Sequence, residues 1–277
     1  MSSNVQTIVV TGAASGIGAA IAGRAMDDGL GVVGLDRTAG HHTAYPLVIG
    51  DVRDLDAHNE CVRRARDLGP LVGWVNSAAI QPPTNLHETD FDVIKDVLDV
   101  DLMGYIKGSS VAVKEWLNFE SAGSIVNISS AHARAAYPNA MAYDIAKAGV
   151  EALTRFTALQ YGPHGIRCNA VAPGAVDTPP LAAIVSDDGL NAPTRGQIGA
   201  THPLMRIAAP SEIAAVVMFL LSDESSFVSG SVIAADGGLT ASCLTFVDGE
   251  ALVPPLHSIR TPRSRGDAST STARVGK

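Results

Sequence analysis

Three side chains between residues 130 and 147 have the types and spacing of an acid–base site. Tyr143 and Lys147 are four residues apart, so on a helix they share one face. A free tyrosine has a pKa of about 10 and is a poor base at neutral pH. A nearby ammonium group and a cationic cofactor ring would both lower that pKa. Tyr143 could then exchange a proton with a substrate oxygen to which Ser130 donates a hydrogen bond.

A glycine-rich segment near the N-terminus is typical of a phosphate-binding turn. The apolar run Val5–Val10 leads directly into Thr11-Gly12-Ala13-Ala14-Ser15-Gly16-Ile17-Gly18, and a helical pattern follows. Glycines permit a tight turn, and the free N–H groups of a helix N-terminus attract a pyrophosphate. Such a turn alone could be purely structural, but its position after the first strand favours a dinucleotide site. Cofactor contacts are expected at Gly12, Ser15, Gly16, Ile17 and Gly18.

The end of the second expected strand bears on the choice of cofactor. A carboxylate at Asp36 can accept both ribose hydroxyls of the adenosine half and would repel a 2′-phosphate. The sequence therefore predicts NAD rather than NADP, although Arg37 keeps NADP open. Asp51 and Val52 follow the third strand. There a carboxylate could meet the adenine amino group, or Asp51 could simply be a solvated loop acid.

The elements that must position these residues alternate between short β-branched runs and longer helical patterns. This alternation predicts the α/β class, with a parallel sheet covered by helices on both faces. The connection from Asp36 to Leu47 is too short for a full helix. The expected strands are Val5–Thr11, Gly31–Asp36, Leu47–Gly50, Val72–Val75, Ser124–Ser129, Arg167–Val171 and Ser231–Ala235, and the expected helices are Gly16–Asp28, Leu55–Leu68, Asp90–Phe119, Ala142–Tyr161 and Ser211–Leu221.

Composition limits the other classes. The chain has 277 residues, is 46% hydrophobic and carries a formal net charge of -8, which disfavours a nucleic-acid partner. There is no secretory signal and no apolar stretch long enough for a bilayer, so we expect a cytoplasmic protein without a membrane partner. The three cysteines form no C-x-x-C pair, and we expect no metal. Six of the eight histidines are interpreted as surface or loop residues without metal spacing; they are His41, His42, His58, His87, His164 and His202.

The domain organisation follows from the same pattern. Residues 1–253 are expected to form one catalytic domain. Residues 254–277 are rich in Pro, Ser, Thr and Arg, with five basic residues against one acidic, and are expected to be a flexible tail. The alternative is an arm that reaches a neighbouring subunit or an anionic partner.

Together these segments resemble the short-chain dehydrogenase/reductase family, of the compact single-domain kind, over roughly Val5 to Thr240. Thr11–Gly18 resembles the cofactor turn, Asn76-Ser77-Ala78-Ala79 resembles the fourth-strand motif, and Ser130, Tyr143 and Lys147 have the catalytic spacing. The resemblance implies a doubly wound, Rossmann-like sheet of about seven parallel strands with helices on both faces, and a homotetramer or homodimer. It also implies cofactor contacts at Asn76, Ala78, Tyr143, Lys147, Pro173, Gly174, Val176 and Thr178.

The sequence departs from the family pattern at a position with chemical consequences. The family usually has a fourth catalytic residue, an asparagine, where this chain has Asp101. A carboxylate near Lys147 would stabilise the ammonium but weaken its pull on the Tyr143 proton. The hypothesis is a working enzyme with a raised apparent base pKa.

The predicted function is hydride transfer between NAD(H) and a small secondary alcohol or ketone. Apolar residues between Pro179 and Thr201 suggest a largely apolar ligand under a lid, or ordinary lid packing. His132, Arg134 and Tyr137 follow Ser130 closely and could shape the substrate pocket. The alternative is a catalytically weak or inactive NAD-binding regulator on the same fold. An epimerase or dehydratase is disfavoured because the length leaves little room for an added substrate domain.

Overall fold

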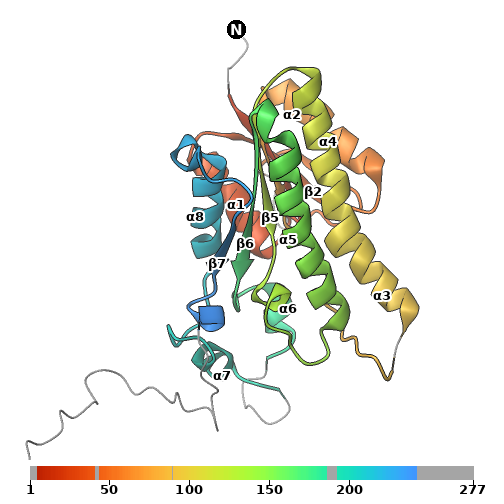
Figure 1. Ribbon diagram of the computed structural model, residues 1–277, viewed down its shortest axis with the longest axis vertical. Coiled ribbons are helices and arrows are strands. Elements are labelled where there is room, and N and C mark those ends of the chain that lie inside the picture. The colour runs from red at the N-terminus through yellow and green to blue at the C-terminus, as the bar shows by residue number, and fades with distance from the viewer. Residues whose placement is uncertain (1–4, 41–43, 89, 186–191, 242–277) are drawn as a thin grey trace, which may run out of the picture.

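The computed structural model describes residues 5–40, 44–88, 90–185 and 192–241. Figure 1 shows these residues as one sheet flanked by helices on both sides. The expected tail, residues 254–277, lies outside the described residues, as do residues 242–253 of the expected catalytic domain.

Seven parallel strands form the sheet in the order β3-β2-β1-β4-β5-β6-β7. The central strands are buried on both faces, which explains their nearly continuous β-branched sequences. The order in which strands are added across the sheet reverses between β1 and β4. A doubly wound sheet binds its ligand at such a point. The strands are β1 (Thr7–Thr11), β2 (Gly31–Asp36), β3 (Leu47–Ile49), β4 (Leu71–Asn76), β5 (Gly123–Ile128), β6 (Ile166–Pro173) and β7 (Val232–Ala235). The predicted fold class is confirmed.

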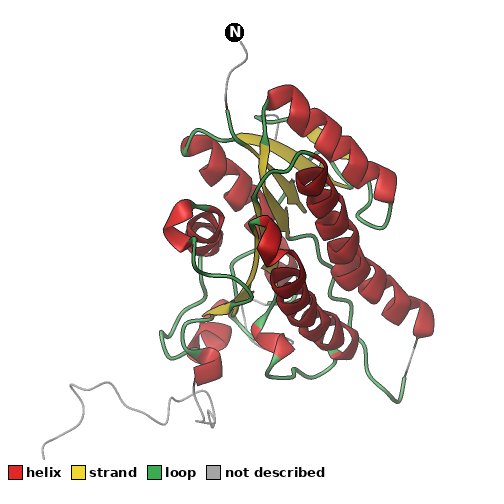
Figure 2. Ribbon diagram, turned by 45° about the horizontal axis from the view of Figure 1, so that its top comes forward, coloured by secondary structure: helices red, strands yellow, loops and turns green. Residues whose placement is uncertain are grey.

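Two layers of helices cover the sheet, as Figures 1 and 2 show. Helices α1 (Gly16–Asp27) and α8 (Pro210–Leu221) pack on each other and on one face. Helices α2 (Leu55–Leu68), α4 (Gly104–Asn118) and α5 (Met141–Tyr161) cover the other face. Two short helices, α6 (Pro179–Ala182) and α7 (Arg195–Ala200), lie beyond the carboxyl end of β6 and were not predicted from the sequence.

Tryptophan packing fixes α4 against the sheet. Trp116 is fully buried, and its Nε1 donates a hydrogen bond to the carbonyl of Leu71 at 2.7 Å. A Cβ on Gly123 would lie 2.1 Å from the Trp116 ring, so only glycine fits there. This contact sets the depth of α4 and therefore the position of its first turn, which reaches the candidate site.

The expected single helix Asp90–Phe119 is interrupted. Helix α3 (Phe91–Leu98) runs into a π-helical turn at Asp99–Met103, where the N–H of Gly104 donates to the carbonyl of Asp99. The turn contains one more residue than an α-helical turn, and such turns are frequent at functional sites. Apolar periodicity does not reveal it, because the residues on either side keep helical spacing.

Two other expectations concern local structure. The described residues between Asp36 and Leu47 contain no helix, as predicted. His58 was expected at the surface but is fully buried in α2, where its Nε2 lies 2.8 Å from the carbonyl oxygen of Val52. It shares a helix face with Cys61 and Val62, which are also buried. In the described residues, no helix is long and apolar enough to cross a membrane.

Candidate active site

The predicted acid–base residues come from two adjacent elements. Ser130 follows the carboxyl end of β5, and α5 begins at Met141, so Tyr143 lies in its first turn and Lys147 one turn later. The Lys147 Nζ lies 5.3 Å from the centre of the Tyr143 ring. A hydrogen bond from the Ser130 side chain favours the phenolate form of Tyr143. The structure therefore brings Ser130, Tyr143 and Lys147 together on one side of α5.

Lys147 is held by a residue that the sequence analysis missed. The Lys147 side chain is 1% exposed. Its Nζ donates to the Tyr105 hydroxyl at 3.0 Å and to the Ile128 carbonyl at 3.1 Å. The Tyr105 hydroxyl donates in turn to the same carbonyl at 3.0 Å. Tyr105 is a buried polar group with its hydrogen bonds made, so it fixes the ammonium in place. In the sequence, only the spacing of four residues between Asp101 and Tyr105 could have indicated this role of Tyr105.

Asp101 lies in the π-helical turn and is fully buried. Its Oδ1 accepts a hydrogen bond from the Ile80 N–H at 2.9 Å, and Oδ2 lies 3.6 Å from the Lys147 Nζ. Oδ2 has no hydrogen-bond partner in the described part of the chain. Burial raises the pKa of Asp101 to about 6, and the Lys147 charge opposes the rise. The predicted juxtaposition of Asp101 and Lys147 is therefore present.

Several opposing effects set the pKa of Tyr143, and burial is the largest of them. Burial raises the pKa of Tyr143 above its usual value, and the Lys147 ammonium, which lowers it, does not compensate. Asp101 and Tyr105 raise the pKa further, while Ser130 lowers it. The lysine alone therefore does not acidify the phenol. A cationic group bound beside Tyr143 would lower this pKa.

The glycine-rich turn fits a dinucleotide phosphate. Gly12 and Gly16 have φ values of 68° and 55°, which favour glycine. A Cβ on Gly16 would lie 3.3 Å from the Thr178 side chain, so the missing side chain leaves space between the turn and that segment. The Ser15 side chain precedes α1 and makes no capping hydrogen bond to it, so it leaves the first N–H groups of the helix to an anion. Ile17 lies in the first turn of α1 and packs against the core.

The Asp36 carboxylate faces the glycine-rich turn. Tyr45, which lies in the short connection between β2 and β3, supports both the turn and Asp36. The Asp36 carboxylate accepts hydrogen bonds from the N–H groups of Ala14 at 3.0 Å and Thr38 at 3.1 Å. Tyr45 is buried, and its hydroxyl donates to the Ala13 carbonyl at 2.7 Å. Burial, with a smaller effect from Asp36, raises the pKa of Tyr45 to about 12. Tyr45 was not predicted, and its side chain packs where the short connection has no helix.

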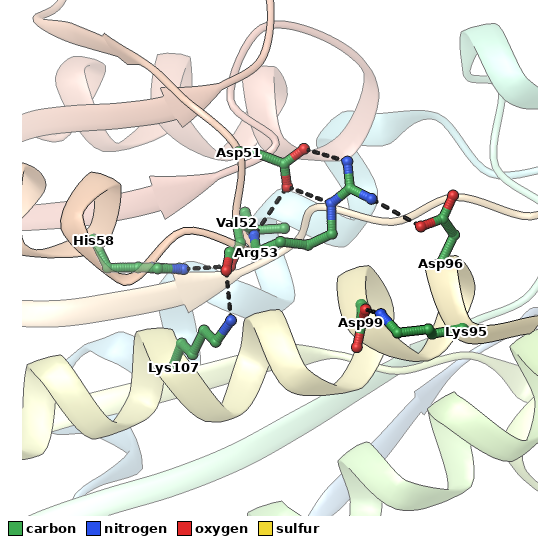
Figure 3. Close-up of polar contacts among 8 residues, drawn as sticks. All are labelled: Asp51, Val52, Arg53, His58, Lys95, Asp96, Asp99 and Lys107. Carbon is green, nitrogen blue, oxygen red and sulfur yellow. Dashed lines mark hydrogen bonds and ion pairs between the residues drawn. The ribbon is translucent and has the colours of Figure 1, made fainter. Parts of the chain in front are cut away.

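Asp51 is bound by a neighbouring arginine, as Figure 3 shows. Arg53 donates to both Asp51 oxygens, at 3.1 and 2.8 Å, and its other nitrogen reaches Asp96 at 2.8 Å. These hydrogen bonds hold the pKa of Asp51 below its usual range. Lys107 donates to the Arg53 carbonyl, and Lys95 pairs with Asp99 nearby. Asp51 is therefore an ionised, paired acid, not a freely solvated one.

The remaining expected cofactor residues occupy positions around the same end of the sheet. The Asn76 side chain donates to Asn127 at 2.8 Å and accepts from Trp74 at 2.9 Å, so it ties β4 to β5. The Ala78 N–H approaches the Thr11 hydroxyl at 3.3 Å. Val52 is buried, and a Cβ on Gly104 would contact its side chain. The positive charge of Arg37 lowers the pKa of Asp51.

The segment after β6 packs on a histidine that was expected at the surface or in a loop. His202 lies in a loop but is buried, and its Nε2 accepts a hydrogen bond from the Ala175 N–H at 3.0 Å. A Cβ on Gly174 would lie 2.5 Å from this nitrogen. Pro173 ends β6, and Val176 is buried. His202 therefore sets the course of the chain towards Thr178.

The three residues that follow Ser130 closely, namely His132, Arg134 and Tyr137, have different surroundings. His132 contacts the Tyr143 ring edge to face, with the ring centres 5.6 Å apart, and stacks on Tyr137. Arg134 approaches Glu151 at 3.4 Å, and about half of its side chain is exposed. His132 is therefore beside the acid–base group.

No group of three or more His, Cys, Asp or Glu in the described residues is arranged to hold a metal ion.

Known proteins are similar to this chain over most of its length. A family model described as enoyl-(acyl carrier protein) reductase matches residues 12–240. Cis-4-hydroxycyclohexanecarboxylate dehydrogenase of Sinomonas cyclohexanicum is 40% identical over 84% of this chain and 96% of its own. The chain belongs to the short-chain dehydrogenase/reductase family.

Other members of the family support an oxidoreductase acting on alcohols. The 3beta-hydroxysteroid dehydrogenase 1 of Eggerthella lenta is 34% identical over 85% of this chain and 94% of its own. The ligand-free structure of Thermoplasma acidophilum aldohexose dehydrogenase has a TM-score of 0.81 and 33% identity, and the match covers 88% of this chain and 98% of that one. The family uses NAD(P), and these relatives indicate a small-molecule alcohol substrate.

Proposed function

We propose that this protein transfers a hydride between NAD(H) and a secondary alcohol or ketone. The observation that carries the proposal is the meeting of Ser130, Tyr143 and Lys147 on one side of α5, beyond the carboxyl end of β5. The glycine-rich turn lies at the same edge of the sheet, where open α/β sheets bind their ligands.

The three side chains divide the proton chemistry among them. During oxidation, Tyr143 as phenolate accepts the hydroxyl proton of the substrate, and during reduction it returns that proton. Ser130 donates a hydrogen bond to the substrate oxygen, because its own Oγ already accepts the N–H of His132 at 3.2 Å. Lys147 supplies a fixed positive charge, and in this proposal it also binds the nicotinamide ribose. The dinucleotide, when bound, supplies the hydride acceptor or donor.

Asp101 belongs to the site as a positioning residue. Its carboxylate neutralises part of the Lys147 charge that Tyr143 would otherwise experience. We infer that this raises the apparent pKa of the catalytic base, so that oxidation in this enzyme has its optimum at a higher pH than with an uncharged residue at the position.

NAD is the proposed cofactor, with NADP the less favoured alternative. The Asp36 carboxylate is oriented by two backbone N–H groups and keeps its remaining lone pairs for ribose hydroxyls. A 2′-phosphate would meet that negative charge. The expected contacts are Gly12, Ser15, Gly16, Ile17, Gly18, Asp36, Arg37, Asp51, Val52, Asn76, Ala78, Pro173, Gly174, Val176 and Thr178.

The proposed substrate is a secondary alcohol on a saturated, largely apolar ring. Two relatives that are 40% and 34% identical act, by their names, on a hydroxylated cyclohexane ring and on a steroid hydroxyl. We therefore choose cis-4-hydroxycyclohexanecarboxylate and cyclohexanol as first probes.

Self-association is part of the proposal. Helices α4 and α5 lie side by side (Figure 1), and the groove between them is lined by apolar residues that include Val113, Leu117 and Phe156. The exposed fractions of Leu117 and Phe156 are 39% and 57%. Such a patch favours a homodimer or homotetramer. Analytical ultracentrifugation should show multimers for the wild type and smaller species for Phe156→Glu.

The deciding experiment follows NADH absorbance with NAD and these alcohols. Tyr143→Phe should lower kcat by about 10²-fold or more while NAD binding persists, since general acid–base catalysis contributes roughly 10²–10⁴-fold. Tyr161→Phe, at the far end of α5, is the matched control and should remain active. Tight NAD binding without turnover of any secondary alcohol would support the alternative, a non-catalytic NAD-binding regulator.

A further inference from the structure

His132 is held in one orientation beside the catalytic tyrosine. Its Nδ1 lies 3.0 Å from the Asp144 Oδ1, and the side chains are 23% and 15% exposed. The second oxygen of Asp144 accepts the Tyr137 N–H at 3.1 Å. Asp144 therefore anchors the segment after Ser130 to the first turn of α5, next to Tyr143.

The partner of Nδ1 determines what the other ring nitrogen can do. A carboxylate accepts hydrogen bonds only, so Nδ1 carries a hydrogen. Nε2 makes no hydrogen bond with any residue that the structure describes. In the neutral ring Nε2 accepts a hydrogen bond, and in the imidazolium it donates one, with Asp144 as the counter-ion.

The position of the ring makes this nitrogen relevant to the substrate. The imidazole contacts the Tyr143 ring edge to face at 5.6 Å and stacks on Tyr137 at 5.2 Å, with 19° between the ring planes. A substrate oxygen bound between Ser130 and Tyr143 brings the rest of the substrate close to this ring. The alternative group, Arg134, is directed to Glu151.

We propose that His132, aligned by Asp144, is a specificity-determining residue that binds a second oxygen-bearing group of the substrate. This inference rests on the proposed function and narrows its substrate class to ring alcohols that carry a carboxylate or a second hydroxyl. A carboxylate accepts from the protonated ring, and a hydroxyl can donate to the neutral ring. The nitrogen is fixed before the substrate arrives, so the contact costs little conformational entropy.

Binding without turnover tests the proposal first. Calorimetry of cyclohexanecarboxylate, which lacks the reacting hydroxyl, with the protein saturated with NAD should give a Kd that rises about tenfold in His132→Phe, or about 1.4 kcal/mol. His132→Gln should recover part of the affinity. His164→Phe, beyond the far end of α5, is the matched control and should bind as the wild type does. An unchanged Kd in His132→Phe, or no binding to the wild type, would exclude a carboxylate site, and together with an unchanged KM for cis-1,4-cyclohexanediol it would overturn the proposal.

Kinetics separates the ligand chemistries. His132→Phe should raise KM for cis-4-hydroxycyclohexanecarboxylate or for cis-1,4-cyclohexanediol about tenfold, with kcat little changed, and should leave kcat/KM for cyclohexanol within about twofold. Loss with the carboxylate alone identifies an anion site, and loss with the diol alone identifies a hydroxyl site. Equal losses with all three alcohols would show a structural role and overturn the proposal. A wild type that oxidises none of them contradicts the proposed function instead, and calorimetry still decides the role of His132.

Discussion

The Oδ2 of Asp101 lies 3.6 Å from the Nζ of Lys147, and both side chains are inaccessible to solvent. The two residues come from the π-helical turn and from α5, so the pair joins two elements of the same helical layer, close to Tyr143. Removing one partner of a buried ion pair leaves the other charge uncompensated. Substitution of either residue therefore tests what the pair contributes.

Asp101→Asn should move the pH dependence of alcohol oxidation. The Asp101 charge raises the pKa of Tyr143, so its removal lowers that pKa and shifts the rise of kcat to lower pH, by on the order of one unit. The measurement is a kcat profile between pH 6 and about 11 with saturating substrate. Asp99→Asn is the matched control, because Asp99 lies in the same turn but pairs with Lys95. An identical profile for Asp101→Asn and the wild type would contradict the role assigned to Asp101.

The same substitution should change the pH dependence of stability. Burial raises the pKa of Asp101 in the folded protein to about 6 from 3.8, so folding retains a proton that the unfolded chain releases. The contribution of Asp101 is therefore fully present below about pH 4 and is lost as the pH rises through about 6. Relative to pH 4, the free energy of unfolding at pH 7 should fall more in the wild type than in Asp101→Asn, by at most about 3 kcal/mol. Denaturant titrations at both pH values measure this, and parallel curves would refute it.

Two glycines of α1 offer a matched pair. A Cβ at Gly18 would lie 2.1 Å from the Gly12 carbonyl oxygen, whereas one at Gly23 meets no atom within 4 Å. Gly18→Ala should displace the phosphate-binding turn and weaken NAD binding more than tenfold. Gly23→Ala should keep NAD affinity and stabilise the helix by up to about 1 kcal/mol. Calorimetric Kd values and thermal melting report both effects, and equal NAD affinities in the two variants would argue against the turn as the phosphate site.

Asp36→Asn should reduce the discrimination between NAD and NADP. The amide keeps an acceptor for one of the two backbone N–H groups but loses the negative charge that opposes a 2′-phosphate. We expect the ratio of kcat/KM for NAD to that for NADP to fall at least tenfold. Asp28→Asn, an exposed acid paired with Arg24, controls for the loss of charge alone. A wild type that already prefers NADP would overturn the assignment of Asp36.

The sequence predicted what depends on local pattern. The β-branched runs, the glycines between β1 and α1, and the spacing of Tyr143 and Lys147 are visible in the chain because each has a short-range physical cause. Strand and helix bounds agree with the structure to within a few residues for most elements. The side-chain roles assigned to Ser130, Tyr143 and Lys147 stay predictions until the variants are measured.

What the sequence did not reveal depends on contacts between distant segments. Tyr105 meets Lys147 across 42 residues, and Tyr45 meets Ala13 across 32. His202 is buried against Ala175 across 27 residues, whereas the burial of His58 could have been inferred from Cys61 and Val62 on the same helix face. The raised pKa of Tyr143 is likewise a property of the assembled site, since burial outweighs the lysine charge that spacing alone suggested.

The extra residue in the Asp99–Met103 turn is accommodated locally. Because the wider π-helical turn takes up one more residue in nearly the same rotation as an α-helical turn, the apolar stripes of α3 and α4 keep their alignment on either side of it. Deleting one residue here would let the chain wind as an uninterrupted α-helix with both stripes in place, but it would displace the Asp101 carboxylate from the Lys147 ammonium. A single-residue deletion at this place should therefore damage the site far more than the packing of the two helices.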